Sequence, residues 1–209
     1  MTLVGAVTLI PGEYNALRDK GRGFGGLSVP GADALAKARS IPAALAQMQM
    51  CEAAQVTLEA MLSPQANRTI AATTCLTRAN LVLRDNPTMA IAHLARAVSL
   101  MTLEERKEAG VSRRMSAQFA ANENWITVRR LAASFFFYRP GGDTPDSIDA
   151  ADVRKLLKSN SYRPALVDLY LRYPAWQAWF TQTMEEQDGR DQRAFLALMR
   201  QRRMSEAGL

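Results

Sequence analysis

Apolar residues recur at helical spacing along almost the whole chain from Ile41 onward. A period of about 3.6 residues places an apolar stripe on one face of an α-helix. Runs of valine, isoleucine and threonine, which favour strands, are scarce outside the first ten residues. The pattern therefore predicts an all-α fold with more than about 60% helix, against an average near one-third in globular proteins.

Prolines, glycines and capping residues divide the periodic region into about seven helices. The first helix is expected over 41–62 and the second over 67–84. The apolar stripe of the first helix consists of Ala44, Met48, Cys51, Leu58 and Leu62. Asn86 is the expected N-cap of the third helix, and Pro87 its first residue. Helices joined by short loops are typical of stacked antiparallel hairpins, the arrangement of an α-solenoid.

A long fourth helix is expected from about Ser112 to Tyr138, after a break at Gly110. Its stripe consists of Ala121, Trp125, Val128, Ala132 and Phe135. This register predicts that Trp125 belongs to the core. Shorter helices are expected at 150–158, 164–172, 175–184 and 190–203.

The strongest loop signal in the chain is the segment 139–145, of sequence RPGGDTP. We therefore expect an N-terminal helical block over 32–139, a loop over 140–149 and a C-terminal helical block over 150–209. Residues 1–31 are expected to hold an apolar N-terminal run and a glycine-rich linker.

The run Met1–Ile10 is uncharged and mostly apolar, and it is shorter than the roughly 20 residues that span a bilayer. It is interpreted either as a buried strand or as the end of a membrane anchor that begins upstream. Arg18, Lys20 and Arg22 follow it and mildly disfavour an exported domain.

The glycines of 21–26 formally satisfy G-x-G-x-x-G, but no strand directly precedes them and a proline follows. A flexible linker is therefore favoured over a nucleotide site.

The segment 83–97, LRDNPTMAIAHLARA, places a proline at a helix junction and small residues in the helix that follows. It resembles the junction between two tetratricopeptide repeats, whose period is about 34 residues. Two pairs of prolines show that spacing, Pro30 with Pro64 and Pro140 with Pro174. The resemblance covers residues 56–109 and implies a protein-binding scaffold without catalysis. A generic array of helical hairpins is the alternative explanation.

Cys51 and Cys75 are the only cysteines, and each lies twelve residues from Ser63, at the expected turn between the first two helices. Facing positions of an antiparallel hairpin are equally distant from its turn, so the two are candidates for a disulfide if their Cα atoms approach to about 5.5–6 Å. A bond would indicate an oxidising compartment, most simply a bacterial periplasm, with Met1–Ile10 as part of an inner-membrane anchor. Free thiols that fill a tight helix seam would instead indicate the cytoplasm.

The sequence offers few residues for catalysis or metal binding. His93 is the only histidine, and no sharp turn presents a nucleophile near it. Asp146 and Asp149 belong to a series of acidic residues that enters a helix, so they are interpreted as its N-cap and first-turn residues, with a cation site as the alternative. We therefore predict a non-enzymatic protein with no cofactor, no metal and no catalytic residue.

Aromatic residues concentrate towards the C-terminus, several of them beside arginines. An exposed aromatic patch of this kind would be a groove for a protein partner, whereas core packing is the alternative. The candidate partner-binding residues are Arg163, Arg172, Tyr173, Trp176 and Trp179. The leading functional prediction is accordingly a scaffold or adaptor that binds another protein.

The net charge of +6 is spread along the chain. A basic balance favours anionic partners, so the alternative function is a basic helical module that binds nucleic acid or an anionic membrane surface. A salt titration separates the two functions, because phosphate-driven binding weakens steeply with salt. Membrane association through an N-terminal anchor is compatible with either.

Overall fold

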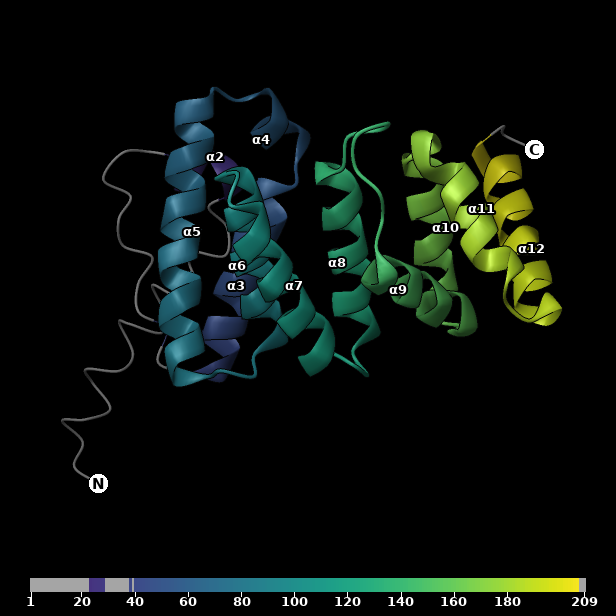
Figure 1. Cartoon of the computed structure of the whole chain (residues 1–209), viewed down its shortest axis with the longest axis horizontal. Helices are drawn as coiled ribbons and strands as arrows, with labels where there is room; N and C mark the ends of the chain where they lie inside the picture. The colour runs from purple at the N-terminus through teal and green to yellow at the C-terminus, as the bar shows by residue number, and fades with distance from the viewer. Residues whose placement is uncertain (1–22, 29–37, 39, 207–209) are drawn as a thin grey trace. The chain divides into compact units, whose positions relative to one another are not determined.

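The computed structural model describes residues 23–28, 38 and 40–206. About 80% of these residues are helical and none of them lies in a strand. They form eleven α-helices and one 3-10 helix (Figure 1). The all-α prediction is confirmed, and the expected count of about seven helices is too low. The run Met1–Ile10 lies outside the described residues.

The chain divides into two compact units, unit 1 up to Phe119 and unit 2 from Ala120. This division differs from the expected boundary at 140–149. The loop at 139–145 lies within unit 2, because the helices on either side of it, α8 (Asn124–Phe137) and α9 (Ser147–Lys158), pack against each other. A loop rich in proline and glycine marks a turn, and it does not by itself mark the end of a core.

Unit 1 is built around α6. Its helices are α2 (Gly23–Leu27), α3 (Ile41–Gln55), α4 (Leu58–Leu62), α5 (Gln65–Asp85), α6 (Ala90–Thr102) and α7 (Arg106–Phe119). Helices α3, α5 and α7 all pack against α6 (Figure 1). In a solenoid each repeat contacts only its neighbours along the chain. The contact between α3 and α6 joins neighbouring hairpins and does not by itself identify a solenoid, so the solenoid-like stacking of hairpins is not confirmed.

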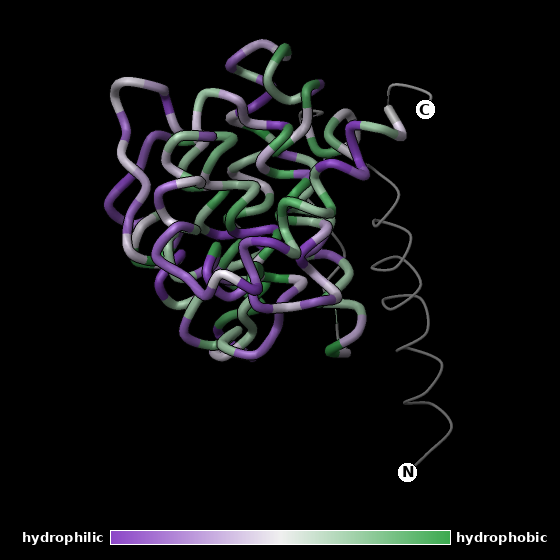
Figure 2. The backbone as a smooth tube through the Cα atoms, turned by 90° about the vertical axis from the view of Figure 1, so that its right-hand side faces the viewer, coloured by the Kyte–Doolittle hydropathy of each residue, from purple (hydrophilic) through white to green (hydrophobic). Residues whose placement is uncertain are grey.

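Alanine dominates the buried side chains of unit 1. The buried alanines of α3, α5 and α6 are Ala43, Ala44, Ala46, Ala54, Ala71, Ala72, Ala79, Ala90, Ala92, Ala95 and Ala97. Helix axes approach more closely where the side chains between them are small. Hydrophobic and hydrophilic residues are interspersed along the chain (Figure 2), and α3 and α6 are buried on most of their sides.

A threonine interrupts the helix predicted over 41–62. The chain leaves α3 and enters α4 through Thr57, which is the N-cap of α4. The Thr57 hydroxyl accepts a hydrogen bond from the Ala60 amide at 3.1 Å and donates one to the Ala54 carbonyl at 3.0 Å. A side chain that bonds the local backbone in this way competes with continuation of the helix.

Asn86 ends a helix instead of beginning one, which corrects the predicted N-cap. As the C-cap of α5, its amide donates to the Val82 carbonyl at 2.7 Å. Because α6 begins only at Ala90, Pro87 lies in the turn between the two helices. Asparagine is favourable near both ends of helices, so the residue type alone did not decide between them.

The long helix predicted over 112–138 is two helices, α7 and α8. Gly110 lies inside α7, and the true break comes after Phe119. In α8, Ile126 is buried, whereas Trp125 is only half-buried and its Nε1 donates to a carboxylate oxygen of Glu123 at 3.1 Å. The prediction that Trp125 is a core residue is therefore wrong, whereas Phe135 of the same stripe is buried, and Val128 and Ala132 pack partly buried against the core.

The expected glycine-rich linker contains a short helix. Within it, Gly23–Leu27 forms α2, which packs against α3 and α5 and buries Phe24 and Leu27. Gly23 has a φ of 60°, a left-handed conformation that glycine adopts without steric cost. The flexible-linker prediction is therefore wrong for this segment, because its two large apolar side chains find a buried site.

Unit 2 is built around α9. Its other elements are α8, α10 (Arg163–Arg172), the 3-10 helix η2 (Pro174–Trp176), α11 (Gln177–Glu185) and α12 (Gly189–Glu206). Helices α8, α10, α11 and α12 all contact α9. Asp146 is the N-cap of α9 and Asp149 lies in its first turn, as predicted, and the two also form a capping box. Asp146 Oδ1 accepts from the amides of Ile148 at 2.8 Å and Asp149 at 3.2 Å.

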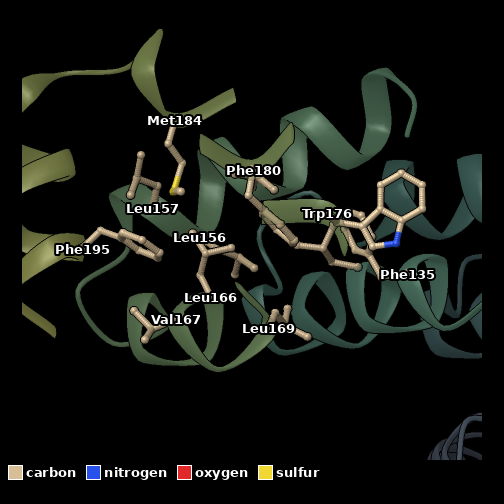
Figure 3. Close-up of a cluster of buried hydrophobic side chains, with 12 residues drawn as sticks. Phe135, Leu156, Leu157, Leu166, Val167, Leu169, Trp176, Phe180, Met184 and Phe195 are labelled. Atoms are coloured by element: carbon tan, nitrogen blue, oxygen red, sulfur yellow. The ribbon is translucent and has the colours of Figure 1, made fainter. Parts of the chain in front are cut away.

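Large side chains fill the core of unit 2 (Figure 3). The cluster consists of Leu131, Phe135, Val153, Leu156, Leu157, Leu166, Val167, Leu169, Trp176, Phe180, Met184 and Phe195. At its centre the ring of Phe135 lies 4.7 Å from that of Phe180, centroid to centroid. Aromatic pairs at this distance add to the stabilisation that area burial provides.

Candidate binding surfaces

The predicted disulfide joins α3 to α5 in unit 1. Cys51 and Cys75 are bonded, their Cα atoms are 5.5 Å apart, and both side chains are fully buried. The two helices run in opposite directions (Figure 1). The prediction of a facing pair is confirmed, although α4 stands where a simple turn was expected. A disulfide indicates an oxidising, extracytoplasmic compartment.

Buried hydrogen bonds connect the disulfide region to α6. Gln55 Nε2 donates to the Cys51 carbonyl at 2.9 Å and to Ser99 Oγ at 3.0 Å. Ser99 Oγ in turn donates to the Ala95 carbonyl at 2.9 Å. Because unpaired polar groups are costly in a core, these bonds specify how α3 meets α6. The sequence does not reveal these bonds, since a lone glutamine on a helix gives no sign that it is buried.

Helix α4 turns its large side chains towards solvent. We call Leu58, Met61 and Leu62 the apolar face of α4, and their exposed fractions are 64%, 52% and 74%. Ala60 is the buried residue of this five-residue helix. The periodicity of the sequence predicts Leu58 and Leu62 in the core stripe of a longer helix. That prediction is wrong because the break at Thr57 changes the phase of the residues after it.

Of the aromatic residues proposed for partner binding, Trp176 belongs to the core of unit 2, and Tyr173 and Trp179 are partly buried against it. Trp176 is 8% exposed, and its ring centroid lies 5.6 Å from that of Phe135 (Figure 3). The rings of Trp179 and Tyr173 also pack against Phe135, at 5.5 and 5.8 Å. The Tyr173 hydroxyl donates to the Ala132 carbonyl at 3.2 Å, and burial raises its pKa. Trp176 is therefore a core residue that Phe135 of α8 covers, and a partner-binding role for the half-buried Tyr173 and Trp179 stays a prediction.

Arg163, another proposed contact residue, joins elements within unit 2. Its buried guanidinium donates to the Leu157 carbonyl at 2.6 Å, to Asn160 Oδ1 at 3.0 Å and to Asp191 Oδ1 at 2.9 Å. These bonds satisfy the end of α9 and hold the beginning of α12. Arg172 is exposed, and a partner-binding role for it stays a prediction.

A second buried arginine connects α8 to α9. Arg130 Nε and Nη2 bond to the two carboxylate oxygens of Asp152 at 2.8 and 2.6 Å. Burial raises the pKa of Asp152, and the hydrogen bond to Arg130 opposes that rise. Close by, Lys155 Nζ donates to Thr127 Oγ1 at 3.0 Å, and burial lowers its pKa. The pair has the geometry of a structural ion pair that sets the alignment of two helices.

His93 packs within unit 1. It is half-buried, its Nε2 donates to the Pro87 carbonyl at 2.8 Å, and its ring stacks on Phe119 at 5.5 Å. Burial lowers the pKa of His93; the bond to Pro87 opposes this change, and the charge of Arg96 adds to it. These contacts account for the residue as part of the packing between α6 and α7.

Among the described residues, no group of three or more histidines, cysteines, aspartates or glutamates is placed to hold a metal ion. No helix in the same part of the chain is long and apolar enough to cross a membrane. Comparisons of the chain with family models, with curated proteins and with solved structures found no match.

Proposed function

We propose that this chain is a non-enzymatic adaptor that binds another protein through the apolar face of α4. Of the seven large apolar side chains exposed in the described part of the chain, three lie within the five residues of α4. This concentration is the observation that carries the proposal. Exposed apolar side chains scattered singly are normal, whereas a contiguous group is typical of an interaction site.

The energetics of the apolar face favour a partner that buries it. Removing a leucine or methionine side chain from water is worth about 1.5–3 kcal/mol, and the isolated chain leaves this stabilisation unused at three positions. Leu58, Met61 and Leu62 follow the spacing i, i+3, i+4 of residues that anchor a helix in a hydrophobic groove. The partner is therefore a protein groove lined by aliphatic side chains.

Charge contributes little to this interaction. Glu59 is the single charged residue of α4. A partner that recognises α4 gains its affinity from apolar contact, so binding should depend only weakly on salt. This distinguishes the proposed interaction from recognition of an anionic partner, which loses affinity steeply as salt rises.

The disulfide would present α4 on a rigid support. Cys51 and Cys75 connect the two long helices between which α4 lies in the sequence. Restricting the freedom of these helices lowers the entropy that binding would otherwise cost. The resemblance of residues 56–109 to tetratricopeptide repeats fits the same role, as does a location in a bacterial periplasm. An anchor formed by Met1–Ile10 remains part of the proposal.

The proposal can be tested with a photo-crosslinking residue placed at position 62 of the full chain, exported to the periplasm with its disulfide intact. We expect a discrete adduct with one protein, lost when Leu58→Ser and Met61→Ser are added. The matched control is Ile41→Ser with Val111→Ser, which removes two exposed apolar side chains outside α4 and should leave the adduct unchanged. No adduct, or an adduct that the control abolishes equally, contradicts the proposal.

A further inference from the structure

Helix α12 has one face that packs in unit 2. Phe195 is buried there, beside the partly buried Leu198 and Met199. On the same side, Arg202 forms a bidentate ion pair with Asp168 of α10, with Nη2 to oxygen distances of 2.7 and 3.0 Å. The helix thus has a defined orientation, and near its start Asp191 also bonds to Arg163 of α10, while Gln192 Nε2 donates to the Glu185 carbonyl of α11.

The opposite side of α12 combines arginines with large apolar side chains. We call Arg193, Leu196, Arg200, Arg203 and Met204 the outer face of α12; they follow the spacing i, i+3, i+7, i+10, i+11 and all are exposed. Leu196 is 42% exposed and Met204 56%. Such spacing aligns the five residues along one side of a helix.

The positive charge of the outer face is not neutralised by described residues. None of the three arginines forms an ion pair with a side chain in that part of the chain. Asp191, the acidic residue near the start of α12, pairs with Arg163 on the inner side. The outer face therefore presents three guanidinium groups with two apolar side chains among them.

We propose that the outer face of α12 binds the surface of an anionic lipid bilayer. A helix that lies in the interface needs basic residues for the headgroups and apolar side chains that enter the boundary with the acyl chains. The arginines supply the first, and Leu196 and Met204 supply the second. The charge complementarity involves three basic groups on a single helix, close enough to meet one patch of headgroups.

A bilayer fits the outer face better than nucleic acid does. Proteins that bind single strands stack the bases on aromatic side chains, and the outer face has none. Leu196 and Met204 would have no counterpart on a phosphate backbone. The disulfide also indicates an extracytoplasmic compartment, where the chain would meet lipid surfaces. This inference is independent of the role proposed for α4.

The test uses the full chain with its disulfide intact and vesicles of phosphatidylcholine with or without phosphatidylglycerol. In sedimentation assays we expect binding only to the phosphatidylglycerol vesicles, and weaker binding as salt rises. Each arginine near an anionic surface changes the affinity about fivefold, so Arg193→Gln, Arg200→Gln and Arg203→Gln together should weaken binding about a hundredfold. Leu196→Ser with Met204→Ser should also weaken it.

A matched control separates this surface from the effect of net charge. Arg84→Gln, Arg114→Gln and Arg139→Gln remove the same charge from exposed positions outside α12. The control should bind vesicles almost as the parent does. Equal weakening by both triple variants overturns the proposal, as does unchanged binding of the α12 variants. Binding to an oligonucleotide but not to vesicles would make nucleic acid the partner. A variant lacking the apolar face of α4 should keep its vesicle binding, so the two proposals fail separately.

Discussion

Units 1 and 2 achieve a helical core with different side chains. Unit 1 buries mostly alanine around α6, and a disulfide connects two of its helices. Unit 2 buries leucines and aromatic rings around α9, and two buried arginines connect its helices. The difference lies in how much apolar surface each helix contact removes from water.

The comparison suggests why the covalent bond lies where it does. An alanine buries little apolar surface, and the hydrophobic stabilisation is roughly proportional to that surface. Contacts rich in alanine therefore contribute less per residue than contacts rich in leucine and phenylalanine. A disulfide stabilises by restricting the unfolded chain and does not depend on side-chain area. Unit 1 thus relies more on its cross-link, and unit 2 relies on its packing.

The largest expected effect is loss of the central ring of unit 2. Phe135→Ala should lower the free energy of unfolding by about 3–5 kcal/mol, because it leaves a cavity among packed rings. Phe136→Ala is the matched control and should cost less, because Phe136 is only half-buried. All three tryptophans lie in unit 2, so tryptophan fluorescence during denaturation reports on this unit. Equal costs for the two variants would contradict the assigned register of α8.

Breaking a buried ion pair in unit 2 should lower the free energy of unfolding by about as much as Phe135→Ala does. Arg130→Leu leaves the Asp152 carboxylate buried without its partner, which should cost about 3–5 kcal/mol. The double variant with Asp152→Leu should be more stable than Arg130→Leu alone, because it leaves no unpaired charge. Urea unfolding of the two variants checks this order. The reverse order would show that Asp152 gains its stability from other partners.

Removing the disulfide should lower the stability of unit 1. Replacing Cys51 and Cys75 by alanine opens a loop whose ends are separated by 24 positions. For a loop of that length the expected cost is about 3–4 kcal/mol. Far-UV circular dichroism should register a destabilised transition that tryptophan fluorescence does not follow. Thiol counting in denaturant, with and without reductant, checks that the bond forms; two free thiols without reductant would contradict it.

The helix caps provide a smaller test of the corrected boundaries. Asp146→Ala removes the capping box of α9 and should cost about 1 kcal/mol. Asn86→Ala should cost less than about 0.5 kcal/mol, because Asn86 caps α5 with its backbone amide, which alanine keeps. Thermal unfolding compares the two variants. A larger cost for Asn86→Ala would restore it as an N-cap.

The smallest expected effect is a pH dependence from His93. The pKa of His93 in the folded protein lies below 6.5, the value for an exposed histidine. As the pH falls, the unfolded chain therefore binds the proton before the folded protein does. Stability should therefore fall as the pH drops below about 6.5, until the folded histidine is also protonated. His93→Gln should reduce this loss, as measured by unfolding followed by circular dichroism at several pH values. An unchanged pH dependence would assign the effect to other groups.

The sequence by itself determined the helical class, the facing cysteines and the cap of α9. Each of these follows from local rules, because periodicity, equal distance from a turn and a capping box depend on residues close together in the chain. The C-terminal helices also lie close to where the sequence placed them. Even the wrong prediction at Asn86 found the right junction and missed only which helix the residue caps.

The sequence also placed Ala44, Met48 and Cys51 correctly in the core, but only the tertiary structure decided which residues are buried beyond a helix break and where the two units divide. A break at Thr57 resets the helical phase, so Leu58 and Leu62 are exposed, and Trp125 lies at the edge of the core. Which aromatic rings remain exposed depends on whether a distant helix covers them, as Phe135 covers Trp176. At these positions burial depends on contacts between segments far apart in sequence, which the local pattern does not contain.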